Sequence, residues 1–169
     1  MKQPRFEMMG QIVTALALAL LAGGAHAQFF YSAPPPLMGQ PSFHLYSVPG
    51  VIAGGGLETF FSCTNTTSAH IRVGIEVFDL AGGAAMNDAS ATSLDFYPGG
   101  SWRFGTNAAY AIATQSQLGV PVVSVGSARI LATKKSGIIC NAFLADSVNF
   151  PPTSMVKLTV VKKKTQKGE

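Results

Sequence analysis

The chain has 169 residues, of which 12% are charged and 47% are hydrophobic, and it contains 18 glycines. An ordinary soluble domain has about 25% charged residues, so this composition disfavours a cytosolic enzyme and favours a secreted protein rich in β-structure. The formal net charge of +4 is unevenly placed. Residues 28–160 carry six basic and six acidic side chains, so this range is formally neutral. The positive charge that follows residue 160 lies on Lys162, Lys163, Lys164 and Lys167.

Residues 1–27 have the pattern of a secretory signal peptide. Lys2 and Arg5 form the positive end, Ile12–Leu21 is the apolar run, and Ala25-His26-Ala27 offers small residues for cleavage before Gln28. The apolar run is shorter than the roughly 20 residues of a spanning helix. We therefore expect a mature chain without a transmembrane segment, located in the periplasm or outside the cell.

We divide the mature chain into a leader at 28–49, one domain at 50–161 and a basic tail at 162–169. The leader contains an aromatic group, Phe29–Tyr31, followed by Pro34–Pro36. Because proline lacks an amide donor and favours extended backbone, we expect a loosely held spacer. An arm that docks on a neighbouring molecule is the alternative. We interpret the tail as a solvated end; binding to nucleic acid, anionic lipid or acidic polysaccharide is the alternative.

Short β-forming runs separated by turn residues predict the strands of the domain. His44–Ala53 is expected at an edge because it contains Pro49. In His70–Asp79, apolar residues alternate with Arg72, Gly74 and Glu76, which predicts one buried face and one face in water. The remaining predicted strands are Leu57–Thr64, Ser93–Tyr97, Ser101–Gly105, Val125–Thr133, Gly137–Ala145 and Met155–Val161.

Two longer connections are expected between these strands. Ala81–Ser90 is predicted to be a flexible loop, and Thr106–Gly119 a loop with a short helix. Trp102 and Phe104 fall on one face of their strand and are expected in the core. Seven or eight short strands with no strong helix predict an all-β fold, an antiparallel β-sandwich.

The two cysteines, Cys63 and Cys140, are predicted to form a disulfide. Ile138, Cys140, Ala142 and Leu144 share one face of their strand, so we expect Cys140 to point inward and the bridge to cross the core. An even pair of cysteines in an oxidising compartment favours a structural bridge. A redox pair and two free buried thiols are the alternatives, although no Cys-x-x-Cys spacing occurs.

Three features resemble bacterial surface modules of the immunoglobulin-like and fibronectin type III-like kind. They are Cys63-Thr64-Asn65 at a strand end, Val77-Phe78-Asp79 before a Gly-rich turn, and Pro98-Gly99-Gly100 leading into an aromatic strand. The resemblance covers about Leu57–Val161 and implies a β-sandwich fold with no particular activity. Trp102 follows Cys63 too late to be the core tryptophan of an antibody-type domain.

No catalytic, metal or cofactor site is predicted. The mature chain has two histidines, His44 and His70, and no hydrolase, metalloprotease or phosphate-binding motif. A serine such as Ser62 or Ser124 has no base beside it in the sequence. The aspartates near strand ends lack the spacing of a calcium site and are interpreted as turn residues; they are Asp79, Asp88, Asp95 and Asp146. Asn65-Thr66-Thr67 is a glycosylation acceptor in a eukaryotic host only.

These patterns favour a non-enzymatic binding or structural module whose partner is a cell-envelope component, a glycan or a protein at a surface. Its ligand is expected at the loops Ala81–Ser90 and Thr106–Pro121. No nucleic-acid partner is expected, because no basic patch is interleaved with aromatic residues. Two alternatives stay open: an assembly subunit that adds a strand through its aromatic arm, and a hydrolase whose residues, including His70, meet only in space.

Overall fold

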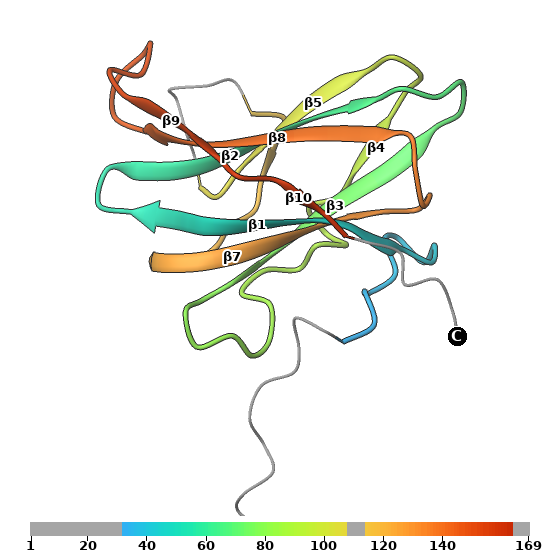
Figure 1. Cartoon of the computed structure of the whole chain (residues 1–169), viewed down its shortest axis with the longest axis horizontal. Helices are drawn as coiled ribbons and strands as arrows, with labels where there is room; N and C mark the ends of the chain where they lie inside the picture. Colours follow the sequence, from blue (N-terminus) through green and yellow to red (C-terminus); the bar gives the residue numbers. More distant parts are fainter. Residues whose placement is uncertain (1–31, 108–113, 164–169) are drawn as a thin grey trace, which may run out of the picture.

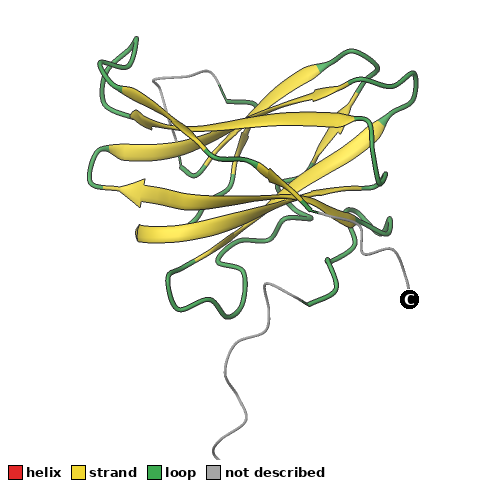
Figure 2. Ribbon diagram, in the orientation of Figure 1, coloured by secondary structure: helices red, strands yellow, loops and turns green. Residues whose placement is uncertain are grey.

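Ten β-strands and no helix make up residues 32–107 and 114–163, the part of the chain that the computed structural model describes (Figures 1 and 2). The all-β prediction is therefore confirmed for these residues. In chain order the strands are β1 (Phe43–Gly54), β2 (Leu57–Asn65), β3 (Ile71–Phe78), β4 (Leu94–Phe96), β5 (Ser101–Gly105), β6 (Ser116–Gln117), β7 (Val123–Ala132), β8 (Ile138–Asp146), β9 (Met155–Leu158) and β10 (Val161–Lys162).

The strands form one sheet in the order β4-β3-β7-β1-β2-β5-β6, with β8 on β2, β9 on β8 and β10 on β1. Every pair is antiparallel except β5–β6. β1 and β2 pair only beside their turn, at Ala53–Glu58 and Gly54–Leu57. Because the two strands separate beyond these pairs, the sheet bends sharply there and curls into a nearly closed barrel (Figure 1).

Both edges of the curled sheet are connected across the barrel. After β9 pairs with β8, the chain crosses over, and β10 pairs with β1 at Tyr46–Lys162. On the other side, Ser116 Oγ donates a hydrogen bond to the carbonyl of Thr92, just before β4. These links leave few open strand edges, which are the usual sites of unwanted pairing between molecules.

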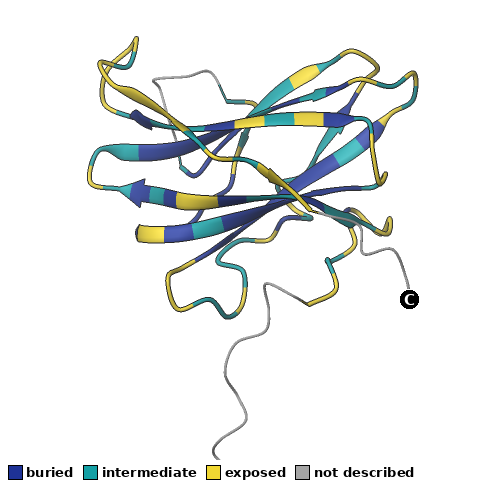
Figure 3. Ribbon diagram, viewed as in Figure 1, coloured by how far each residue is buried: buried dark blue, intermediate teal, exposed yellow. Residues whose placement is uncertain are grey.

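Buried and exposed residues alternate along much of the strands (Figure 3), and the buried residues form one main hydrophobic core. Phe104 is fully buried, its ring centroid lies 6.1 Å from that of Phe96, and Trp102 packs against the same cluster. The prediction that Trp102 and Phe104 belong to the core is confirmed. The fully buried aliphatic residues of this core include Val48, Val51, Ile71, Val73, Ile75, Val77 and Ile130.

The prediction that His44–Ala53 is an edge strand is wrong. β1 lies inside the sheet, with β7 along one side and β10 and β2 on the other. Pro49 is tolerated because the β1–β7 register is irregular between Pro49 and Val51, and at such a bulge the missing amide donor costs no regular ladder bond. The expected domain start at residue 50 therefore falls in the middle of β1.

The prediction that one face of β3 is exposed to solvent is also wrong. Gly74 and Glu76 are buried, because the segment 32–42 and the loop after β3 cover them. A Cβ atom at Gly74 would lie 2.7 Å from Leu37 Cδ2 and from the carbonyl oxygen of Ala89, so only glycine leaves room for the fully buried Leu37. The described part of the leader is thus packed onto the sheet, and it is not a loose spacer.

The loop after β3, predicted to be flexible, is attached to its strand by Asn87. Its Oδ1 accepts a hydrogen bond from the amide of Val77 at 2.9 Å, and its Nδ2 donates one to the carbonyl of Ile75 at 2.8 Å. The side chain therefore forms hydrogen bonds with a backbone amide and a backbone carbonyl of β3, as the backbone of a neighbouring strand would. Of the predicted short helix within Thr106–Gly119, residues 108–113 lie outside the described part of the chain, and the described remainder contains β6.

The predicted disulfide between Cys63 and Cys140 is present, with a different placement from the one expected. The two cysteines are directly opposed residues of β2 and β8, with a Cα–Cα distance of 4.1 Å. Such a short distance is typical of a non-hydrogen-bonded antiparallel pair. The bridge therefore joins neighbouring strands and does not cross the core. Cys63 is fully buried, and Cys140 packs against the same core cluster.

Candidate functional site

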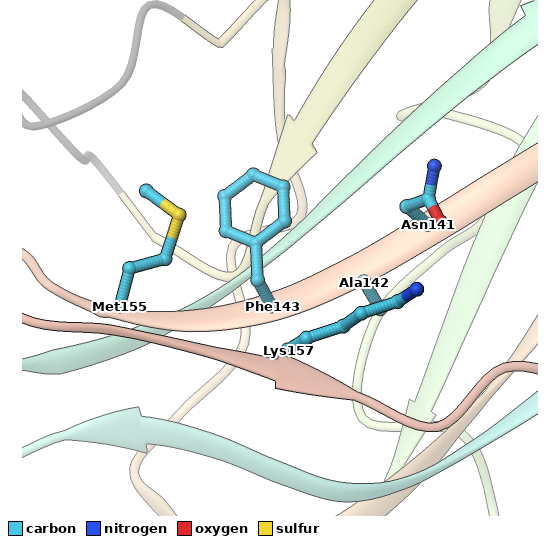
Figure 4. Close-up of a pocket in the computed structure, with 5 residues that line it drawn as sticks. All are labelled: Asn141, Ala142, Phe143, Met155 and Lys157. Atoms are coloured by element: carbon cyan, nitrogen blue, oxygen red, sulfur yellow. The ribbon is translucent and has the colours of Figure 1, made fainter.

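A shallow groove runs along the outer face of the β8–β9 hairpin. Its first part has a volume of about 410 Å³ and is lined by Asn141, Ala142, Phe143, Met155 and Lys157 (Figure 4). A second hollow, also of about 410 Å³, shares Asn141 and Lys157 and continues to Val160. We call these two hollows together the hairpin groove. The register that opposes Phe143 to Lys157 places the lining residues of the two strands side by side.

The side chains of the hairpin groove suit non-covalent binding. Phe143 stacks on the fully buried Phe60, with ring centroids 5.6 Å apart, so the apolar part of the groove rests on a fixed support. The exposed side chains of Asn141 and Lys157 add an amide that can donate or accept hydrogen bonds and a cation. The first hollow is mostly apolar and the second is more polar; apolar surface combined with a few polar groups is typical of ligand sites.

Asp146 holds the loop that connects the two strands of the groove. Its carboxylate accepts hydrogen bonds from the amide of Val148 at 2.8 Å, from the Asn149 side chain and from Thr153 Oγ1 at 2.7 Å. These donors favour the charged form and hold the pKa of Asp146 well below its ordinary value. The aspartate thus forms a turn, as predicted, and also fixes one end of the groove.

This network predicts a loss of stability in acid that depends on Asp146. A carboxyl whose pKa is lower in the folded state contributes stability above its unfolded pKa of about 4, and this contribution is lost as the pH falls further toward the folded value. Asp146→Asn should therefore be less stable than the parent at pH 7, and the difference should shrink below about pH 4. Urea unfolding across this pH range measures it, with the exposed Asp79→Asn as control. A pH-independent difference would contradict the assignment.

His70 meets a carboxylate, as the hydrolase alternative requires, but at the surface. Its Nδ1 lies 3.3 Å from Asp95 Oδ2, and the two side chains are 55% and 42% exposed. The ring also makes an edge contact with Tyr97. No hydrogen bond from a described serine reaches His70, and neither hollow of the hairpin groove includes it. Ser62 and Ser124 lie within β2 and β7.

His44 lies close to a serine in an arrangement that opposes catalysis. Its Nε2 is 3.0 Å from both the carbonyl oxygen of Tyr46 and Ser47 Oγ. A carbonyl oxygen can only accept, so Nε2 carries the hydrogen that joins it to Tyr46 and cannot take a proton from Ser47. Burial, followed by the charges of Lys163 and Arg129, lowers the pKa of His44 to about 4. The ring is therefore a neutral, structural donor at pH 7.

Asn65 of the predicted glycosylation acceptor is fully buried. Its Nδ2 donates to the carbonyls of Ala69, Phe96 and Tyr97 at 2.7–3.2 Å, and its Oδ1 accepts from the amide and hydroxyl of Thr67 at 2.9 Å. The side chain thus joins the end of β2 to two turns. A glycan on Nδ2 is incompatible with these contacts.

The other aspartates serve local structure. Asp88 Oδ1 accepts from the amides of Ser90 and Ala91 at 2.8 and 3.1 Å, which closes a turn as predicted, and Asp79 is exposed after β3. Among residues 32–107 and 114–163, no three potential ligand side chains of the His, Cys, Asp or Glu type gather at one point.

Sequence reasoning missed a buried ion pair on the outer face of the sheet. Arg129 Nε donates to Glu76 Oε2, and the two side chains are only 2% and 8% exposed. Arg129 Nη1 also donates to the carbonyl of Ser32 at 2.9 Å, and the guanidinium lies 5.4 Å from the Phe78 ring centroid. The sequence offered one indication of this pair: Glu76 and Arg129 are single, oppositely charged residues in two predicted strands, and β3 and β7 oppose them in the structure.

Comparison with protein-family models, with curated proteins and with solved structures found no match. In the described residues, no helix has the length and apolar character needed to cross a bilayer.

Proposed function

We propose that the protein is a non-enzymatic, secreted module that binds a component of the cell envelope through the hairpin groove. The observation that carries this proposal is the groove itself, whose apolar floor and exposed Asn141 and Lys157 lie on two paired strands. Sites on strands are more rigid than sites on loops. The ligand position differs from the loops at 81–90 and 106–121 that the sequence favours.

Export is supported by the signal-peptide pattern of residues 1–27 and by the disulfide. Thiols that pair within hydrogen-bonded strands persist as disulfides in the periplasm or outside the cell, whereas the cytosol keeps them reduced. A non-enzymatic role is supported by the surroundings of the two histidines: His70 is largely exposed beside Asp95, and the hydrogen of His44 Nε2 is committed to a backbone carbonyl.

The assembly alternative is favoured by one observation, the exposed edge strand β9. Within the described residues β9 pairs only with β8, and Met155, Val156 and Lys157 are exposed, so a strand from another copy has an edge to pair with. Residues 32–42, however, pack on their own sheet through Leu37. A truncation that tests the aromatic arm should therefore stop at residue 31.

We further infer that the barrel divides into two layers, β4-β3-β7-β1-β10 and β6-β5-β2-β8-β9. The short β1–β2 ladder and the crossing between β9 and β10 support this division, because strands that switch sheets form the corners of sandwiches. The features shared with immunoglobulin-like modules are the all-β class and the single disulfide; the ten described strands exceed the seven or eight predicted. In antibody domains the disulfide joins two sheets, whereas here it joins neighbours in one layer.

Binding assays with matched variants test the proposed function. The probes are a glycan panel, a peptide panel and fractionated cell-envelope polymers. A probe that binds the parent should lose at least about tenfold in affinity with Asn141→Ala/Lys157→Ala, because a hydrogen bond and a charge contact are removed together. Gln117→Ala, on exposed β6, should leave affinity unchanged. A monomer that binds none of the probes, or binding insensitive to the double variant, would contradict the proposal.

A further inference from the structure

The first residues of β1 bring together lysines from two distant segments of the chain. Lys135 Nζ lies 5.1 Å from the Phe43 ring centroid, Lys162 pairs with Tyr46, and the amide of Lys163 donates to the carbonyl of Leu45 at 2.8 Å. Figure 1 shows the β7–β8 loop and the start of β1 at the same, right-hand end of the barrel, and β10 runs toward that end. We call Lys134, Lys135, Lys162 and Lys163, all exposed, the basic end.

The acidic residues of the described chain lie mostly elsewhere or are engaged. Glu58 and Asp146 lie near the β1–β2 turn, at the opposite end of β1, as their pairing with Ala53 and Leu57 shows. Glu76 is bonded to Arg129, and Asp79 follows the far end of β3. Asp88 lies in the loop that returns along β3, and its carboxylate accepts hydrogen bonds from the amides of Ser90 and Ala91. Asp95 is at the same end as the lysines and faces His70. In the sequence, Lys163 is followed by two more lysines, Lys164 and Lys167, and by one acidic residue, Glu169, so this segment adds a net positive charge of one.

The chemistry of the basic end fits a flat anionic surface. Its four members are all lysines, which act as flexible point charges, whereas arginine forks are suited to defined phosphate geometry. Two lie in the β7–β8 loop and two lie in or directly after β10, and neither hollow of the hairpin groove includes them. A linear polyanion is usually held in a charged groove, with aromatic stacking where bases are bound. A headgroup layer requires only several cations on one side of the protein.

We propose that the basic end binds the anionic phospholipid surface of a membrane and so holds the exported module beside the envelope. This inference rests partly on the proposed export of the protein. It does not depend on the hairpin groove, whose lining residues include none of the four lysines. In this proposal the positive charge of the C-terminal tail also contacts the anionic surface. In the interpretation as a solvated end, the same charge contacts only water.

Vesicle co-sedimentation tests this proposal with protein purified after expression of the full chain. The probes are vesicles of neutral phosphatidylcholine, with and without about 30% phosphatidylglycerol, at about 0.05 M and about 0.5 M salt. The parent should bind the anionic vesicles at low salt and be released at high salt. Lys134→Gln/Lys135→Gln should weaken binding by roughly tenfold to thirtyfold, since each lysine near such a surface contributes roughly fivefold.

A matched single-charge comparison separates the basic end from net charge. Lys134→Gln should weaken binding by roughly fivefold, and Arg103→Gln, in the middle of β5, should change it by less than about twofold because its charge lies outside the basic end. Equal binding to neutral vesicles, or equal effects of the two variants, would overturn the proposal. Binding to a soluble acidic polysaccharide or nucleic acid without vesicle binding would overturn it as well. Loss of groove binding alone leaves these vesicle results unchanged, so the two proposals fail separately.

Discussion

Replacing Arg129 by methionine is expected to lower the free energy of unfolding by about 3–5 kcal/mol, because removal of one partner leaves a buried charge uncompensated. Glu76 would remain only 8% exposed and lose its cationic partner. The substitution also removes the hydrogen bonds to Ser32 and the cation over Phe78. Urea unfolding of both proteins at pH 7 measures the difference, provided that the slope with denaturant is unchanged.

The matched control removes both charges at once. Glu76→Leu/Arg129→Met should recover much of the lost stability, because an apolar pair of similar volume in place of a buried ion pair is often neutral or stabilising. If the double variant is as unstable as Arg129→Met, the contacts of Arg129 with the segment at Ser32 matter more than its charge. A single variant within about 0.5 kcal/mol of the parent would contradict the burial of this pair.

The strands were predictable because their signals are local. The alternation of apolar residues over Ile71–Val77 gives one buried face of β3 directly, and the glycine and proline turns separate the strands nearly where they end. Side-chain alternation also placed Trp102 and Phe104 correctly in the core. These patterns depend only on neighbours in the chain and on the period of two.

The parts that could not be predicted depend on contacts distant in the sequence. From the sequence, the second face of β3 is predicted to be exposed to solvent. No residue near Gly74 and Glu76 in the chain indicates that the leader, which contains Leu37, will cover this face. Likewise, Pro49 suggests an edge until the β1–β7 irregularity is known. Inward-facing cysteines are equally compatible with a bridge within a layer or across the core, since only the β2–β8 register opposes Cys63 to Cys140.

The sequence shows the basic tail at 162–169, but the hairpin groove and the place of Lys134 and Lys135 beside that tail could not be predicted, for the same reason. Asn141 and Lys157 become neighbours through the β8–β9 pairing. Lys135 and Lys163 come to the same end of the barrel only because both segments return to the start of β1. Each residue alone is an ordinary exposed polar side chain. Their chemistry therefore becomes visible only once the strand order is known.

Removing the disulfide is expected to have the other large effect on stability. The bridge closes a separation of 77 residues, which in the chain-entropy model corresponds to about 4 kcal/mol. Cys63→Ala/Cys140→Ala should lose about this amount, with an added loss because Cys63 is fully buried. Urea unfolding at pH 7, with and without reductant, measures the effect on the parent and the variant.

The role of the disulfide also bears on where the protein works. The parent should become less stable on reduction by about as much as the variant, and the variant itself should not respond to reductant. Because β2 and β8 pair along their whole length, we expect the reduced chain to keep its fold with lower stability. A parent that does not respond to reductant would contradict the bridge. In a reducing compartment the chain would lack this stabilisation, so a large measured loss would support export to an oxidising one.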